Sequence, residues 1–163
     1  MTLEIEPLSR EGFRVYGEYQ NLYDIEPYRK TPPGDSGFYP DIMTLNLGRD
    51  TLPALCVSKI RKRPMKIETM EYHRRTAEFL LPLDADCVIF VGQACKSFDP
   101  SALRCFRVPK GTAVRLNPGV IHGTQFVLGQ EWARVLILLP EHTYDNDVVK
   151  MKLDTPISIR NPQ

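Results

Sequence analysis

Short apolar runs recur between residues 42 and 140, and they limit how this chain can fold more than any other feature. Turn-forming residues such as Asp84, Pro109, Gly111 and Gly129 separate them. The runs are IMTLNL, ALCVSKI, KIETMEYH, AEFLLPL, CVIFVG, LRCFRV, TAVRLNPGVIHG, TQFVLG and WARVLILLP. Many strand-length runs with frequent turns predict an all-β sandwich or barrel. No long helical pattern lies between them, which argues against a sheet built from βαβ units.

The length of 163 residues suits one domain with a core of its own. We divide this single domain into residues 1–41, a barrel core at 42–141 and a tail at 142–163. In the first part, PLSREGFRVYGEY predicts a short helix with Ser9 as N-cap and Gly17 as its stop. The tail either adds a final strand or packs outside the barrel.

Residues 20–41 are rich in proline, with four, and contain two glycines and four aromatic side chains. The aromatic side chains argue against disorder, so we expect an extended arm. Such long loops in compact domains are usually functional or interfacial.

Composition narrows the class of partner. A net charge of +1 gives no sign of a nucleic-acid or membrane partner. The N-terminus lacks a secretory pattern, and no apolar stretch approaches the roughly 20 residues that span a bilayer. The four cysteines form no CxxC pair, so we expect free thiols. Together these features predict a cytoplasmic protein that acts on a small molecule.

Polar side chains interrupt the apolar pattern at KIETMEYHRRTAEF. Residues two apart in a strand share a face, so Glu71 and His73 project together. The segment 74–76 can turn the chain, and Glu78 then returns toward the same place.

A second polar feature follows the tight-turn sequence Asn117-Pro118-Gly119. His122 lies on the returning strand, where it can meet Glu71, His73 and Glu78 if both strands line one barrel. A single histidine or glutamate in a strand is usually structural. Two of the three histidines here lie at matched positions around turns, which favours a metal or catalytic site. Imidazole and carboxylate suit Zn, Mn, Fe or Ni, and the residues alone do not choose among them.

These two features resemble the two cupin motifs. The first motif is HxH, three or four residues and then Glu, and here it is Glu71-Tyr72-His73, four residues and Glu78. The second is Gly, five residues, PxG, two residues and His, and here it is Gly111, six residues, Pro-Gly, two residues and His122. Glu71 thus replaces the first histidine. The resemblance implies a cupin-type double-stranded β-helix, or jelly roll, with Glu71, His73, Glu78 and His122 as the metal ligands.

A narrower resemblance covers roughly residues 6–140. PLSREGFRVYGEY, EYHRRTAEFLLPL and VPKGTAVRLNPGVIHG are similar to segments of ureidoglycolate lyases. Glu78 stands where that family has Gln, and Ile121 where it has Trp, so the chain resembles a divergent relative. The resemblance implies a metal-dependent C–N lyase that releases glyoxylate and urea.

In this interpretation Glu71 or Glu78 is the catalytic base. Arg115 is a candidate clamp for the substrate carboxylate, and His142 is peripheral. Two alternatives stay open: a metal-dependent isomerase or epimerase of a sugar or hydroxy acid, and a non-catalytic cupin that binds a small ligand. Since cupins commonly dimerise through a sheet, we also expect a homodimer.

Overall fold

A computed structural model describes residues 1–25, 39–48, 52–95 and 98–160. Residues 26–38, which make up most of the predicted arm, lie outside the described residues, so the arm stays a prediction. The described elements are β1 (Thr2–Pro7), α1 (Arg10–Phe13), β2 (Gly17–Asn21), β3 (Pro53–Arg61), β4 (Lys66–Tyr72), β5 (Glu78–Pro82), β6 (Cys87–Gln93), η1 (Pro100–Ala102), β7 (Arg104–Val108), β8 (Thr112–Leu116), β9 (Val120–Ile121), β10 (Phe126–Val127), β11 (Trp132–Pro140), α2 (Thr143–Asn146) and β12 (Val149–Arg160). None of the helices in this described part is long and apolar enough to cross a membrane.

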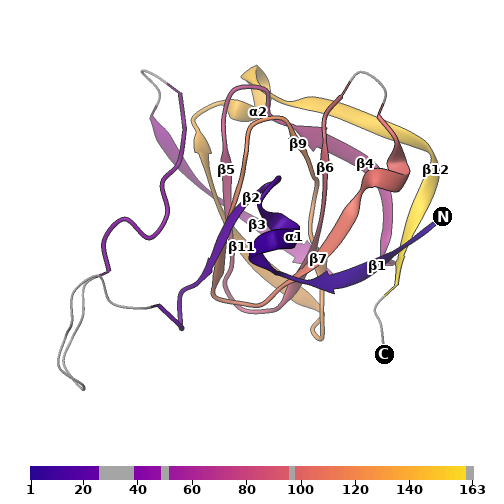
Figure 1. Cartoon of the computed structure of the whole chain (residues 1–163), viewed down its shortest axis with the longest axis horizontal. Coiled ribbons are helices and arrows are strands. Elements are labelled where there is room, and N and C mark those ends of the chain that lie inside the picture. The colour runs from indigo at the N-terminus through magenta and orange to yellow at the C-terminus, as the bar shows by residue number, and fades with distance from the viewer. Residues whose placement is uncertain (26–38, 49–51, 96–97, 161–163) are drawn as a thin grey trace.

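The strands form two sheets that enclose a common interior (Figure 1). One has the order β10-β6-β7-β1-β12-β4, with β9 paired to β6, and the other has the order β2-β8-β5-β11-β3. Leu80 and Val114 of the second sheet pack with Ile89 and Phe106 of the first in one buried cluster. The burial of such side chains from water is the main favourable term in folding. The predicted all-β, barrel-like fold is confirmed.

The predicted N-terminal helix is confirmed, although it is shorter than its sequence pattern. Ser9 is its N-cap and accepts a hydrogen bond from the Gly12 N–H at 3.1 Å. Phe13 ends α1 and is buried in the barrel core. Gly17 does not stop the helix but begins β2. A Cβ at this position would lie 1.7 Å from the Arg115 carbonyl oxygen of the paired strand β8, so a larger residue would clash there. The glycine therefore permits close pairing of β2 with β8.

Both ends of the described chain contribute to the first sheet. β12 pairs parallel with β1 and antiparallel with β4, along the right edge of Figure 1. The tail thus adds a final strand, one of the two expected outcomes. Sheet strands come from before and after residues 42–141, which were expected to contain the barrel core.

One expected strand is wrong. Residues 42–47, the run IMTLNL, are irregular. Two of their backbone carbonyls accept single hydrogen bonds: that of Thr44 from the Arg115 side chain at 3.0 Å, and that of Asn46 from the Ala77 N–H at 3.0 Å. An apolar run that makes no ladder of backbone hydrogen bonds with another strand is not itself a strand.

All four cysteines are free thiols, as predicted. Cys87 and Cys105 are fully buried in opposite faces of the barrel wall. Burial, the largest cause, raises the pKa of each thiol to about 12. These two cysteines therefore pack as small apolar residues and are not nucleophiles.

Candidate metal centre and its cavity

Three buried side chains converge at one end of the barrel interior: His73, Glu78 and His122. The Glu78 Oε2 atom lies 2.8 Å from His73 Nε2 and 3.0 Å from His122 Nε2. The three ligand atoms all lie within 4.8 Å of one another. The structure thus brings together three of the four residues predicted to bind a metal.

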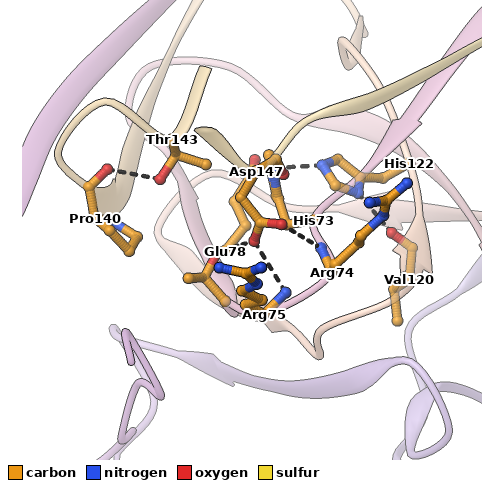
Figure 2. Close-up of polar contacts among 10 residues, drawn as sticks. His73, Arg74, Arg75, Glu78, Val120, His122, Pro140, Thr143 and Asp147 are labelled. Atoms are coloured by element: carbon orange, nitrogen blue, oxygen red, sulfur yellow. Dashed lines mark hydrogen bonds and ion pairs between the residues drawn. The ribbon is translucent and has the colours of Figure 1, made fainter. Parts of the chain in front are cut away.

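The turn between β4 and β5 places His73 and Glu78 side by side. Asp147 holds this turn, as Figure 2 shows. Its carboxylate accepts hydrogen bonds from the backbone N–H groups of Arg74 and Arg75 at 3.0 and 2.9 Å, and from the Thr76 hydroxyl at 3.3 Å. A single carboxylate therefore satisfies three donors of the turn, and Glu78 can return to His73.

The second motif is joined to the first through the backbone. His122 follows β9 and exchanges two hydrogen bonds of 2.8 Å with Glu71, at the end of β4. The Gly119 N–H donates to the His73 carbonyl at 2.7 Å. Gly119 has φ +79°, a left-handed conformation that glycine adopts without strain. The predicted tight turn therefore aligns His122 with His73.

Backbone carbonyls set the orientation of both imidazole rings. His73 Nδ1–H donates to the Asp147 carbonyl at 2.9 Å, and His122 Nδ1–H donates to the Val120 carbonyl at 2.8 Å. Each neutral ring then directs an unprotonated Nε2 at Glu78 Oε2. Three lone-pair donors that face one another repel unless a cation or additional protons lie between them. Two imidazole nitrogens and a carboxylate oxygen, with both outer nitrogens hydrogen-bonded, fit a divalent metal ion.

Without a metal ion, protons lie between the ligand atoms of His73, Glu78 and His122. Burial alone would raise the pKa of Glu78, but His122 and His73 lower it to about 2. Burial alone would lower the pKa of His122, but Glu78 raises it to about 8. The metal-free site therefore contains an imidazolium–carboxylate pair at neutral pH.

Glu71 lies beside this group but is not part of it. Residues directly opposite in a strand pair share a face, so its side chain projects with that of His122. Its carboxylate oxygens are outside the group whose ligand atoms lie within 4.8 Å. Its predicted roles as ligand and as base stay predictions.

Arg115 lies on the other side of its sheet. It pairs with Phe79, whereas Glu78 pairs with Leu116, so strand alternation directs Arg115 away from Glu78. Its guanidinium donates to the Thr44 carbonyl and forms an ion pair of 3.2 Å with Glu18. This position does not support the predicted role of Arg115 as a clamp for the substrate carboxylate. That role stays a prediction.

A cavity of about 210 Å³ opens beside two of the three side chains, those of Glu78 and His122. Its described lining residues are Cys56, Val57, Ser58, Glu71, Glu78, His122, Gly123, Thr124, Gln125, Ile137 and Tyr144. Burial, followed by the nearby Cys56, Glu78 and Glu71, raises the pKa of Tyr144 to about 12. His142, predicted to be peripheral, is 70% exposed at its side chain.

The sequence interpretation missed Gln125, Tyr144 and Asp147. Gln125 follows His122 by three residues, and this proximity could have indicated it. Tyr144 and Asp147 belong to the segment that was assigned to the tail. Thr143 anchors that segment by donating its hydroxyl to the Pro140 carbonyl at 2.7 Å, which no sequence pattern indicates.

Comparisons with solved structures find distant similarities. An oxalate decarboxylase of Bacillus subtilis is 14% identical with a TM-score of 0.45, and the match covers 63% of this chain and 24% of that one. RmlC from Streptococcus suis, in complex with dTDP-D-xylose, is 14% identical with a TM-score of 0.39, and the match covers 55% of this chain and 44% of that one. Each match therefore covers less than half the length of the other protein. No curated protein matches it.

A family model gives the wider match. The model of the ureidoglycolate lyase family matches residues 1–160, which include both motif segments and the segment that carries Asp147. This range agrees with the resemblance seen in the sequence and extends it to both termini. The chain belongs to the ureidoglycolate lyase family.

Proposed function

We propose that this protein is a metal-dependent lyase that cleaves ureidoglycolate, or a closely related hydroxy-acid adduct of urea, into glyoxylate and urea. The observation that carries the proposal is the buried group of His73, Glu78 and His122 beside Glu71, in a chain of this family. The three grouped residues would hold the metal ion, whose identity among Zn, Mn, Fe and Ni is open. A bound divalent ion would supply Lewis acidity that lowers the pKa of the substrate hydroxyl.

Glu71 is the base in this proposal. Glu78 Oε2 is committed to both histidines, whereas Glu71 lines the cavity outside that group. Its carboxylate removes the proton from the hydroxyl on the carbon that bears the urea nitrogen. The C=O bond of glyoxylate forms as the C–N bond breaks, and the electron pair leaves with the nitrogen. Glu71 then returns the same proton to that nitrogen, so the reaction balances with one carboxylate.

The test is urea release from ureidoglycolate by the purified protein, with metal content measured in parallel. Glu71→Gln keeps the size of the side chain and removes the base, so we expect activity to fall by more than about 100-fold with metal content retained. Glu141→Gln, at an exposed position, is the matched control.

Three outcomes would reject parts of this proposal. Loss of metal in Glu71→Gln would make Glu71 a ligand and not the base. A metal-loaded wild type that releases no urea but isomerises sugars or hydroxy acids would favour an isomerase. Ligand binding without turnover of either class would favour a non-catalytic cupin.

We also propose a homodimer that pairs through the outer face of the five-stranded sheet. Large contiguous apolar patches on protein surfaces usually mark interaction sites. Cross-strand pairs on this face join apolar residues in two rows, Val57-Leu136-Leu81 and Leu55-Leu138-Phe79. Leu55 is 69% exposed and Val57 58% exposed. Light scattering measures the mass in solution, and the wild type should have the mass of two chains. Leu55→Lys places a charge in the proposed interface and should have the mass of one chain. Val15→Lys, elsewhere on the surface, is the control and should stay a dimer. A wild-type monomer would reject the dimer.

A further inference from the structure

Gln125 is a buried polar residue whose side-chain oxygen has no hydrogen-bond partner within the described part of the chain. The residue is 3% exposed, and its Oε1 is one of two such unpartnered buried side-chain atoms there. An unpaired buried amide oxygen destabilises the fold, because it has lost its hydrogen bond to water without gaining another. Its side chain lies in the lining of the cavity that also contains Glu71, Glu78 and His122.

The backbone of Thr124 and Gln125 is fixed by the side chain of Arg63. Arg63 donates through Nη1 to the Gln125 carbonyl at 2.7 Å and through Nη2 to the Thr124 carbonyl at 2.8 Å. Its guanidinium carbon lies 4.2 Å from the centre of the Phe126 ring. These contacts use the backbone and leave the carboxamide of Gln125 without a contact to Arg63. Its Oε1 atom has almost no accessible surface, so it meets a ligand in the cavity by rotation about the last side-chain torsion, which is broad in glutamine.

The size and charge of the cavity limit its ligand. A volume of about 210 Å³ corresponds to roughly seven waters at about 30 Å³ each. None of its described lining residues is a lysine or arginine, so an anionic group gains no ion pair beside Gln125. A neutral group that carries both an N–H donor and a carbonyl acceptor matches a carboxamide in two hydrogen bonds.

We propose that Gln125 recognises the terminal ureido group of the substrate and thereby selects ureido compounds. Gln125 Oε1 accepts an N–H of the terminal amino group, and its own N–H₂ donates to the ureido carbonyl. The opposite end of the ligand, with the reacting carbon, then lies toward Glu71 and His122. This inference rests on the proposed lyase function and adds a residue that determines specificity.

The experiment compares two compounds that cannot undergo the elimination because they lack the hydroxyl group. N-carbamoylglycine has the ureido group, and N-acetylglycine replaces its terminal amino group with a methyl of similar size. By titration calorimetry the wild type should prefer N-carbamoylglycine by more than about tenfold, because only that compound satisfies Gln125 Oε1. In Gln125→Met the ratio should fall to near one. Gln130→Met, the same change at an exposed site, should keep the wild-type ratio.

A folded Gln125→Met variant that keeps the preference would overturn the proposal, and so would a wild type without one. If Gln125→Met does not fold, side-chain amide NMR of the wild type replaces it. The Gln125 amide signals should shift with N-carbamoylglycine and not with N-acetylglycine, and equal shifts would reject the role.

Turnover distinguishes this inference from the proposed function. Urea release from ureidoglycolate with a preference ratio of one would keep the lyase and reject the role of Gln125. A clear preference without urea release would reject the lyase and keep a ureido-binding cavity.

Discussion

His73 and His122 present the same atom to Glu78, but they are oriented by different parts of the chain. The carbonyl that holds His122 belongs to Val120, two residues away, whereas the carbonyl that holds His73 belongs to Asp147, 74 residues away. One half of the site is therefore organised locally. The other half depends on the segment after β11 being in place.

The two turns differ in the same way. The turn before His122 has a hydrogen bond of its own, from the Val120 N–H to the Asn117 carbonyl at 3.2 Å, and Gly119 has a left-handed conformation. The turn after His73 depends on the Asp147 carboxylate for its donors. We therefore expect changes near His122 to act locally, and changes at Asp147 to act at a distance.

Glu78→Gln should affect both halves of the site equally, because both histidines contact Glu78 Oε2. Loss of the charged ligand should weaken metal affinity by more than about 100-fold, beyond the effect of an outer-shell change. Chelator competition measures this affinity, with the exposed Glu68→Gln as control. Affinity retained in Glu78→Gln would exclude Glu78 as a ligand.

The stability of the metal-free protein should depend on pH through the pair of Glu78 and His122. The pKa of Glu78 is lowered from 4.5 to about 2, so its stabilising effect is complete above pH 4.5 and is lost as the pH falls toward 2. The pKa of His122 is raised from 6.5 to about 8, so its effect is complete below pH 6.5 and is lost as the pH rises through 8.

This pair should therefore stabilise the metal-free fold most between pH 4.5 and 6.5. Urea unfolding of chelator-treated protein across that range and beyond it measures the effect. Glu78→Gln should flatten the profile on both sides. An unchanged profile in this variant would show that other groups cause the pH dependence.

Asp147→Ala tests the distant anchor of His73. The change removes the acceptor of three hydrogen bonds, so the free energy of unfolding should fall by about 1–3 kcal/mol. Metal affinity should fall by about tenfold, because the turn that places Glu78 is loosened. The Asp147 carbonyl that holds His73 is retained in this variant. Asp145→Ala, at an exposed position in α2 two residues before Asp147, is the control for both measurements. Equal effects of the two changes would contradict the role of Asp147.

Gly119→Ala should have the smallest effect. A Cβ at Gly119 meets no atom within 4 Å, so the cost is the left-handed conformation alone, about 1 kcal/mol. Gly129 lies outside the site, is also left-handed and also has no atom within 4 Å of an added Cβ, so Gly129→Ala is the matched control. Both variants should lose similar unfolding free energy, and metal affinity should fall slightly in Gly119→Ala and stay unchanged in Gly129→Ala. A large loss of affinity in Gly119→Ala would mean that the local half of the site is less self-contained than its contacts indicate.

Most of the site was predictable because its members lie on strands next to turns. Strand alternation and the short turn predicted that Glu78 returns to His73, and the Asn-Pro-Gly turn predicted the return of His122. Arg115 shows the limit of this reasoning: it is on the strand before the second motif, but its pairing with Phe79 directs it to the opposite face. The run at 42–47 shows another, since an apolar pattern does not reveal whether a partner strand is present.

The sequence by itself determined the all-β barrel, the two motif turns and the types of side chain that meet at them, because these follow from local periodicity and turn chemistry. Only the tertiary structure decided that Asp147 holds the first turn and that Gln125 lines the cavity without a partner. It also separated Glu71 from the group of three ligand atoms. These outcomes depend on strand register and on contacts between residues far apart in the chain, and local patterns carry no record of either.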